Sequence, residues 1–367
     1  MARNLPYTIS TILTILNVIS KIDVNAQPLF PTILVFGDSA VDTGNNNFVT
    51  PIISPNRANH RPYGRDFLDH KPTGRFSNGK LVPDFLAETL GLKEVLPPYL
   101  DPSVSDKELV TGVSFGSGGA GFDELTSFAT GAISMSKQVE YLRQYIEKVT
   151  KIVGEKRCRE LIKKALVVIN AGTDDFVINY YDLPTRRLQY NITGYHYFVL
   201  DRVQSFTEEL HELGCRTMIV AGLPPIGCLP IQITSRFKNP THRSCLEEQN
   251  SDAMSYNQKL LKLIPHAQAS LPGSRILYAD TYTPFMDLIN NPQDYGIEVK
   301  DRGCCGTGYI EAGSLCNVLT PACKNASEYV FWDSVHPTEA VYQYLHDSVI
   351  EQLGPQLFNA PMFSTSL

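Results

Sequence analysis

Short, unbroken runs of apolar residues recur along the chain and predict buried β-strands. The run from Ile33 to Phe36 is rich in β-branched residues and ends at Gly37. A strand that is apolar at every position is buried on both faces, as in parallel sheets. Val113 and Phe115 mark the end of a further short strand. Later runs of the same character are 165–170, 217–221 and 275–280.

Between the strands, apolar residues recur three and four positions apart, which is the spacing of one helix face. The clearest case extends from Val199 to Leu213 and is followed by Gly214, a residue typical of helix C-termini. Further helices are predicted at 83–90, 139–149, 245–271 and 341–353. Strands that alternate with helices indicate parallel strands joined by crossover helices. The predicted fold class is therefore α/β, a three-layer α/β/α sandwich with a parallel sheet.

Two segments between these elements are rich in turn-forming residues. Residues 44–80 contain many Gly, Pro and Asn residues and predict a long ordered loop rather than a linker. Residues 111–121 contain a run of glycines that lets backbone N–H groups approach a ligand closely. No Lys-Ser or Lys-Thr follows that run, which excludes a phosphate-binding loop. The sequence has no internal repeat and no low-complexity linker, so we expect a single domain over residues 27–367.

Residues 1–26 have the pattern of a secretory signal peptide. Arg3 supplies the positive charge, Ile9 to Ile19 is mostly apolar, and Ala26 ends a small-residue cleavage pattern. The alternative is a buried N-terminal helix, because Thr and Asn residues interrupt the apolar core. No apolar run reaches the ~20 residues that a membrane helix needs. We therefore expect no integral membrane segment once the signal is removed.

The charged residues argue against one class of partner. The net charge is -6, and the Lys and Arg residues form no cluster along the chain. Nucleic-acid binding depends on clustered positive charge. No nucleic-acid partner is therefore expected.

The chain contains eight cysteines, all between positions 158 and 323. Half of them lie in the Gly-rich segment 301–326, which shows little periodicity and would gain stability from covalent closure. Zinc is the alternative, but no C-x-x-C pair occurs and the segment has no His. Disulfides are favoured over a metal site, and the sequence leaves their connectivity open.

Two sequons agree with export. Asn191-Ile192-Thr193 and Asn325-Ala326-Ser327 are N-glycosylation acceptors without Pro in the middle position. Together with the signal-like start and the even number of cysteines, they predict a secreted, extracellular glycoprotein.

The candidate chemistry lies at opposite ends of the chain. Ser39 follows the first strand and Gly37, at the strand end where ligands bind in open α/β sheets. A Ser that caps the next helix is the alternative interpretation. Asp333 and His336 stand three positions apart just before the last helix, and Pro337 keeps His336 out of a helical conformation. A carboxylate that orients an imidazole, beside a hydroxyl, is the arrangement of nucleophilic hydrolysis.

Several motifs in this order resemble the GDSL-type esterase/lipases of plants, a branch of the SGNH hydrolase superfamily. The similarity extends from about Phe30 to Leu353. The motifs that support it are Phe36–Ser39 with Asp42–Asn47, Gly74–Gly79, Ser117–Gly121, Leu223–Cys228 and Trp332–Pro337. The α/β-hydrolase elbow G-x-S-x-G is absent, because position 41 is Val, and that fold is disfavoured.

The resemblance implies a flavodoxin-like fold and a role for each matching residue. Ser39 is the nucleophile, His336 the general base and then the acid, and Asp333 orients the imidazole. The backbone N–H groups of Ser39 and Gly118 donate to the oxyanion. No metal and no organic cofactor are implied, and the substrate is a small-molecule or polymeric acyl ester, cleaved through an acyl-enzyme. The resemblance to plant proteins also makes the cell wall or apoplast the expected location.

The chain departs from the family pattern at two positions. Ala40 stands where the family name has Leu, which is a minor change. Asp174 stands where the family has an Asn whose amide completes the oxyanion hole. An ionised Asp offers no donor, and loss of one such donor costs about 3–4 kcal/mol, roughly 10²–10³ in rate. We hypothesise that Asp174 acts protonated, so that Asp174→Asn raises activity near neutral pH; the alternatives are low activity, or a gap filled by Asn170 or water.

These patterns favour a secreted serine hydrolase that cleaves carboxylic esters, such as acyl lipids, through Ser39. An acyltransferase that uses the same triad is a variant of this function. A catalytically weak glycoprotein that binds acyl or glycan ligands is the alternative from another class, favoured by Asp174. Acyl chain length and the alcohol moiety are left open by the sequence.

Overall fold

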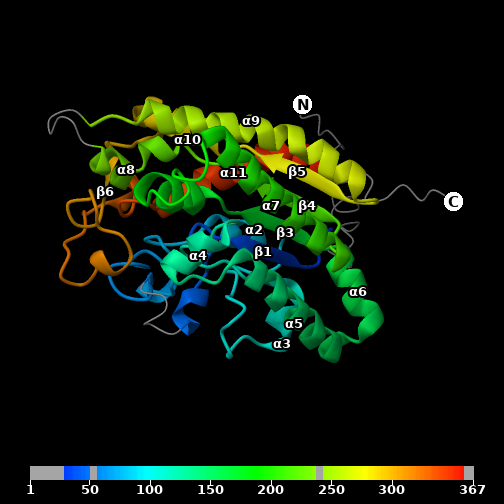
Figure 1. Cartoon of the computed structure of the whole chain (residues 1–367). Helices are drawn as coiled ribbons and strands as arrows, with labels where there is room; N and C mark the ends of the chain where they lie inside the picture. Colours follow the sequence, from blue (N-terminus) through cyan, green and yellow to red (C-terminus); the bar gives the residue numbers. More distant parts are fainter. Residues whose placement is uncertain (1–28, 50–55, 237–242, 359–367) are drawn as a thin grey trace, which may run out of the picture.

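A computed structural model describes residues 29–49, 56–236 and 243–358, and the predicted signal peptide at 1–26 lies outside these residues. A five-stranded, fully parallel sheet with strand order β2-β1-β3-β4-β5 forms the centre of the molecule (Figure 1). The strands are β1 (Ile33–Gly37), β2 (Gly112–Ser114), β3 (Leu166–Asn170), β4 (Thr217–Ala221) and β5 (Arg275–Ala279). This confirms the predicted α/β fold, and the strand order is that of flavodoxin-like proteins.

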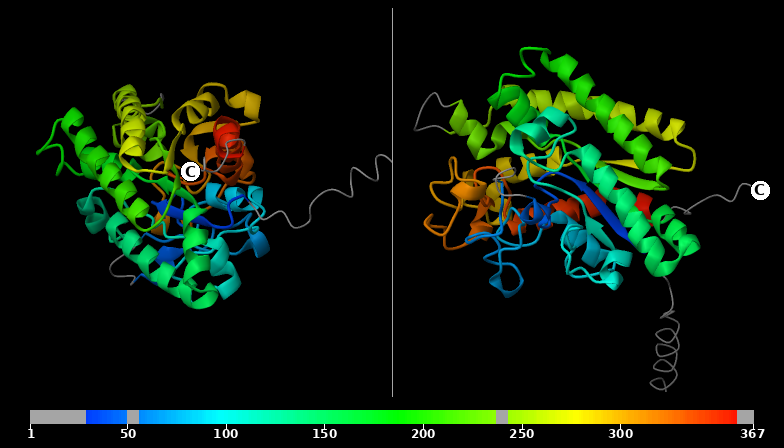
Figure 2. Two further views of the ribbon diagram at one scale, coloured as in Figure 1. Left: turned by 90° about the vertical axis from the view of Figure 1, so that its right-hand side faces the viewer. Right: turned by 60° about the horizontal axis from the view of Figure 1, so that its bottom comes forward.

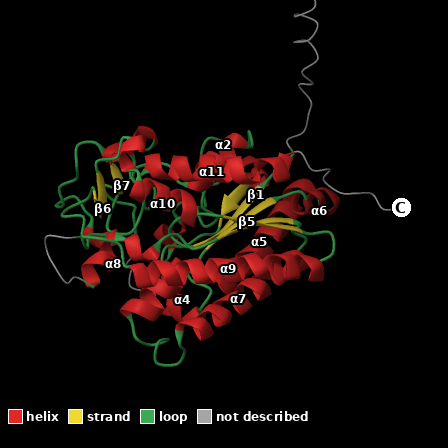
Figure 3. Ribbon diagram, turned by 90° about the horizontal axis from the view of Figure 1, so that it is seen from above, coloured by secondary structure: helices red, strands yellow, loops and turns green. Residues whose placement is uncertain are grey.

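Helices cover both faces of the sheet, and the alternation of side chains along each strand explains the layers. Leu34 and Phe36 of β1 pack into the core beneath α5 (Met135–Val153), α7 (Ile192–Glu212) and α9 (Glu247–Ser270). Ile33 and Val35 point the other way, against α2 (Val82–Thr89) and α11 (Glu339–Phe358). Figure 3 shows α2 and α11 on one side of the strands and α7 and α9 on the other.

Several shorter elements were not predicted. Two of them, β6 (Val299–Gly303) and β7 (Tyr329–Phe331), form a separate parallel pair whose first strand is polar and half exposed. Their sequences are too short or too polar for hydrophobic periodicity to reveal them. The helices of this group are α3 (Asp106–Thr111), α4 (Glu124–Thr130), α6 (Glu155–Lys163), α8 (Pro230–Ser235), α10 (Tyr282–Asn290) and a π-helix (Asp175–Asp182).

The end of β1 lies directly against the end of β3. Gly37 has φ +145°, and a Cβ built there would lie 1.8 Å from the carbonyl oxygen of Asn170. Only glycine fits this close approach. The backbone N–H of Asp38 also donates to the Asn170 carbonyl over 3.0 Å. Because β1 and β3 flank the point where strand order reverses, the turns after them form the ligand-binding edge of such a sheet.

The Gly-rich segment near the C-terminus is held by disulfides, as predicted. Cys304–Cys323 and Cys305–Cys316 close it, and Cys228–Cys245 ties the turn after β4 to the start of α9. Cys158 and Cys215 are buried and unpaired, so the cysteines are not all in disulfides. We call the disulfide-closed segment 301–326 the stapled segment. Both views in Figure 2 place it (orange) beside the loop that precedes α2 (light blue). A hydrogen bond from the Arg65 guanidinium to the Cys323 carbonyl, 2.6 Å long, joins the two.

Candidate active site

Three side chains that are distant in the sequence form a continuous hydrogen-bonded line at the carboxyl edge of the sheet. Ser39 Oγ lies 2.8 Å from His336 Nε2. On the other side of the ring, His336 Nδ1 lies 2.7 Å and 2.9 Å from the two carboxylate oxygens of Asp333. The turn after β1 supplies the hydroxyl, and the segment between β7 and α11 supplies the imidazole and the carboxylate. This line has the geometry in which an imidazole can take a proton from a hydroxyl.

The carboxylate of Asp333 is fully buried and saturated with donors. It accepts the backbone N–H groups of Val335 and His336 over 2.8 Å and 2.7 Å, and so the segment folds back on its own side chain. The Tyr63 hydroxyl donates to the same carboxylate over 2.6 Å. Burial and the Asp333 carboxylate raise the pKa of Tyr63 well above its usual value, so this tyrosine stays a donor.

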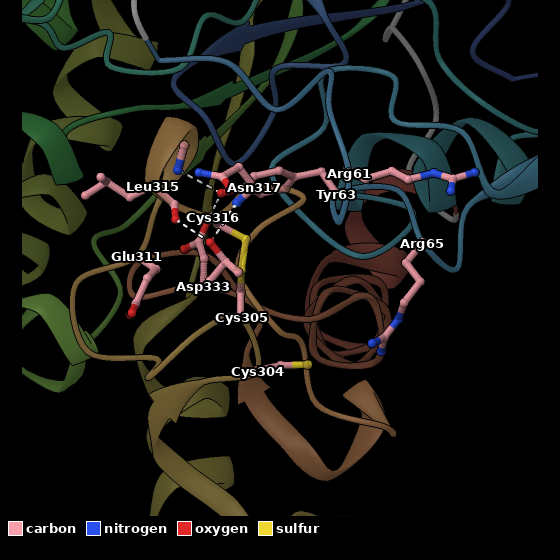
Figure 4. The surroundings of a disulfide bond; sticks show 12 residues. Arg61, Tyr63, Arg65, Cys304, Cys305, Glu311, Leu315, Cys316, Asn317 and Asp333 are labelled. Atoms are coloured by element: carbon pink, nitrogen blue, oxygen red, sulfur yellow. Dashed lines mark hydrogen bonds between the residues drawn. A yellow bond between two sulfur atoms is a disulfide. The ribbon is translucent and has the colours of Figure 1, made fainter.

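Tyr63 is in turn fixed by the stapled segment. The backbone N–H of Gly313 donates to the Tyr63 hydroxyl over 2.8 Å. Figure 4 shows the Cys305–Cys316 disulfide beside Asp333 and Tyr63. The Cys305 backbone N–H also donates to the carbonyl of Trp332 over 2.8 Å, next to Asp333. The disulfides therefore support the acid of the triad, a role that the sequence did not reveal.

We expect Tyr63→Phe to lower kcat about tenfold and to leave KM nearly unchanged. The substitution removes one hydrogen bond to a charged group, which is worth about 1.5–3 kcal/mol, and Tyr63 reaches the imidazole only through Asp333. Steady-state kinetics on a soluble ester give the two constants. Tyr309→Phe is the control, because the Tyr309 ring stacks on the Arg243 guanidinium and its hydroxyl is not among the donors to Asp333. An unchanged kcat in Tyr63→Phe would show that the phenol plays no positioning role.

The Gly-rich turn lies beside Ser39, but its first candidate donor is occupied. The backbone N–H of Gly118 donates to a carboxylate oxygen of Asp42 over 3.0 Å. The other oxygen of Asp42 accepts the N–H groups of Gly44 and Asn45 over 2.8 Å and 2.6 Å. The expectation that the Gly118 amide faces the oxyanion therefore differs from the arrangement in this structure, in which the carboxylate binds it. The next amide, that of Gly119, lies near the Asp174 carboxyl group and acts to lower its pKa.

The Asn-rich motif after Asp42 holds this turn in place. The side-chain amide of Asn45 donates to the carbonyls of Ser114 and Gly116, each over 2.9 Å. The amide of Asn46 donates to the Gly118 carbonyl over 2.9 Å. These contacts explain why a polar motif follows the nucleophile: it satisfies the backbone of a buried turn that has no regular structure of its own.

Asp174 lies at the nucleophile with a buried, unpaired oxygen. Only 8% of the residue is exposed, and its Oδ2 has no hydrogen-bond partner. Burial, with a smaller contribution from the nearby Asp38 carboxylate, raises the pKa of Asp174 to about 8, although His336 and the Gly119 N–H act in the opposite direction. Burial likewise raises the pKa of Asp38 to about 7. Asp38 and Asp174 are buried close together, so ionisation of both is unfavourable. Because the pKa of Asp174 is the higher of the two, its carboxyl group is the one favoured in the neutral form.

The neighbouring Asp175 has a structural role. Its carboxylate accepts the backbone N–H groups of Phe122 and Asp123 over 2.8 Å and 3.1 Å and the Thr126 hydroxyl over 2.6 Å. It therefore ties the Gly-rich turn to the end of β3. The two adjacent aspartates differ because Asp175 is saturated with donors, whereas Asp174 has a buried oxygen without a partner and lines the cavity at Ser39.

The described residues provide neither a cluster of metal ligands nor a helix that could span a membrane. They contain no group of three or more His, Cys, Asp or Glu side chains placed to hold a metal ion. None of their helices combines the length and the apolarity needed to cross a bilayer.

The geometry agrees with comparisons to known proteins. Residues 33–349 match the family model for GDSL-like lipase/acylhydrolase. The chain belongs to this family. One GDSL esterase/lipase of Arabidopsis thaliana is 52% identical over 320 residues, 87% of this chain and 88% of the relative. A second from the same plant is 50% identical over 346 residues, 94% of this chain and 95% of the relative. The resemblance inferred from the motifs is thus confirmed, and the GDSL protein is a carboxylic-ester hydrolase by class.

Two groups at the GDSL site escaped the sequence analysis. Tyr63 lies in an Arg-Pro-Tyr-Gly segment that looked like turn-forming residues only. Asp42 lies in the family motif without an assigned task, although it binds Gly118. One feature of the sequence could have identified both residues. Asp42 and Tyr63 lie in loops that are unusually rich in Gly and Asn, and the buried backbone of such loops needs polar side chains as hydrogen-bond partners.

Proposed function

We propose that this GDSL enzyme is a secreted serine hydrolase that cleaves carboxylic esters through an acyl-enzyme on Ser39. The observation that supports the proposal most strongly is the line from Ser39 Oγ through His336 to Asp333, with contacts of 2.8 Å and 2.7 Å. Nothing in this line requires a cofactor, because every proton that moves has a donor and an acceptor among the three side chains and the substrate.

In the first half-reaction, Ser39 Oγ attacks the ester carbonyl and transfers its proton to His336 Nε2. Asp333 holds Nδ1–H and stabilises the imidazolium that forms. The tetrahedral intermediate then expels the alcohol, which takes the proton from Nε2. In the second half-reaction, water attacks the acyl-enzyme with His336 as the base and releases the acid. An alcohol in place of water would give acyl transfer by the same steps.

The oxyanion is proposed to bind the backbone N–H of Ser39 and the O–H of protonated Asp174. The free, buried Oδ2 of Asp174 and the raised pKa of this carboxyl group support its part. The Gly118 amide, expected as the other donor, must leave Asp42 before it can contribute.

Labelling with a fluorophosphonate probe tests the proposal, because the probe reacts only with a nucleophile activated by a working base. The wild-type protein should be labelled stoichiometrically and Ser39→Ala not at all. Ser136→Ala, an exposed serine on α5, is the matched control and should label normally. Absence of labelling at any pH would favour the alternative, an acyl- or glycan-binding glycoprotein in which Asp174 has disabled the old site.

The same proposal places the enzyme outside the cell, in the wall or apoplast. Asn191 and Asn325, the two sequon residues, are exposed and accessible to glycosylation. The three disulfides favour an oxidising compartment. The acidic environment of a cell wall would also keep Asp174 protonated.

A further inference from the structure

A narrow cavity opens at the reactive atoms and continues into the protein beneath the sheet. Its mouth includes Ser39, Asp174 and His336. From there it passes between the sheet face that carries Val168 and Ile219 and the two helices that cover this face, α2 and α11. We call this cavity the slot. Apart from its mouth, most of its walls are apolar side chains, with Thr281 and Tyr342 as the polar exceptions, so it offers few hydrogen bonds to a ligand.

The slot leads away from the triad along α11. This helix begins close to His336, and its lining residues Tyr342, Leu345 and Val349 follow at helical spacing of three and four. The distance from Tyr342 to Val349 is therefore two turns, about 10 Å. On the opposite wall, Val168 lies two residues before the end of β3, deeper than the Asn170 backbone. The cavity thus extends for about two helical turns, with the nucleophile at one end.

Small residues create the space. Ala221 and Ala279 are paired across β4 and β5, and the small side chains of both line the slot. The core face on the other side of the sheet is instead filled by aromatic residues such as Phe36, Phe115 and Phe206. Interiors are normally close-packed, so an unfilled apolar channel that reaches the nucleophile indicates space for a ligand.

A second, more polar depression lies on the other side of the nucleophile. Ser39 and His336 line it too, together with Asn56, Asp182 and the glycine turn of Gly118 and Gly119. An ester bound at Ser39 has an acyl group and an alcohol moiety, which extend in opposite directions from the reacting carbonyl. The polar depression suits the alcohol moiety, which must leave toward His336 and solvent. The slot suits an acyl chain, which has no hydrogen-bonding groups.

We propose that the slot binds the acyl chain of the substrate, so that the enzyme acts on esters of unbranched fatty acids of medium length. The proposal rests on the esterase function proposed above and adds the substrate class. Each methylene group removed from water contributes about 0.8 kcal/mol, which corresponds to roughly fourfold in kcat/KM. The bottom of the slot, at Val349, limits the chain length that gains from this effect.

Substitutions at Val349 test the slot with p-nitrophenyl acetate, octanoate and palmitate. Val349→Phe should lower kcat/KM for octanoate at least about tenfold and leave acetate unchanged, because an acetyl group does not reach this depth. Val349→Ala should shift the preference toward palmitate. Ile350→Phe, the same substitution one position along α11 and outside the slot, should leave the profile of the wild-type enzyme intact. A wild-type enzyme without chain-length preference, or equal effects of Val349→Phe and Ile350→Phe, would overturn the slot but not the esterase function.

A binding experiment separates the slot from the chemistry. The Ser39→Ala protein should bind dodecanoic acid in calorimetry, and Val349→Phe in that background should weaken binding about tenfold while Ile350→Phe does not. Binding that is unaffected by Val349→Phe would refute the slot. Loss of labelling at Ser39 together with intact dodecanoate binding would refute the esterase function alone.

Discussion

Asp333→Asn should lower kcat/KM about 10⁴-fold, because the imidazole would then be held in the wrong tautomer. The Asp333 carboxylate accepts four contacts, from the Tyr63 hydroxyl, two backbone N–H groups and His336 Nδ1. An asparagine has one acceptor oxygen, and so its NH₂ group must face either a donor or Nδ1. If the NH₂ faces Nδ1, that nitrogen must be the acceptor, and Nε2 then bears the proton and can no longer take one from Ser39.

The measurement is kcat/KM across the pH range on a soluble ester, with far-UV circular dichroism to verify folding. Asp347→Asn is the matched control: Asp347 contacts His346 Nδ1 over 2.8 Å, in a second Asp–His pair at the surface of α11. That variant should keep wild-type activity. A folded Asp333→Asn enzyme within tenfold of wild type would mean that His336 does not depend on this carboxylate for its orientation.

The second large effect is expected at Asp174. Asp174→Ala should lower kcat by about 10²–10³, the usual loss for one oxyanion donor, when measured at a pH where the carboxyl group is neutral. Asp174→Asn should retain the donor as an amide. The groups that face the Asp174 carboxyl group are Asp38, His336 and the Gly119 N–H, and burial outweighs all of them.

The pH dependence follows from the direction of this shift. The pKa of Asp174 is raised to about 8, so the carboxyl group is neutral and can donate below that pH, and it ionises as the pH rises through it. Wild-type kcat should therefore fall on the alkaline side, and Asp174→Asn should remove this fall. From the sequence alone, we expected Asp174→Asn to be more active than wild type near neutral pH. Because the pKa of the buried Asp174 is raised to about 8, this gain is now expected above about pH 8.

Profiles of kcat from about pH 4 to 10, on either side of the raised pKa, distinguish the outcomes. Asp252→Asn is the control, because Asp252 also has a raised pKa but pairs with the Tyr181 hydroxyl away from the nucleophile. If Asp174→Asn is no faster than wild type at any pH and Asp174→Ala is equally active, Asp174 takes no part in oxyanion binding.

Much of the fold was available from local patterns. The strands at 33–36, 165–170, 217–221 and 275–280 and the helix that ends near Leu213 are apolar at periods set by their own backbone geometry, and the structure has them within a few residues. The helix α7 begins at Ile192, earlier than the apolar stripe, because Asn191 caps it by accepting the Gly194 N–H over 2.8 Å. Elements that are short and mostly polar, such as α6 and strand β6, were missed, because they carry too few apolar residues to stand out along the chain.

The sequence by itself determined the parallel α/β architecture and, through the order of its motifs, the GDSL family. It also identified Ser39, Asp333 and His336 as candidate catalytic residues. These depend on residue type and on spacing along the chain. The tertiary structure decided what depends on distance between remote segments: the 2.8 Å contact from Ser39 to His336, the Tyr63 donor to Asp333, and the disulfide partners. It also decided that Asp42 binds the Gly118 amide and that Asp174 is buried beside Asp38, which raises the pKa of Asp174. Hydrogen bonds and desolvation act over a few ångströms in space, and only the folded chain brings such groups together.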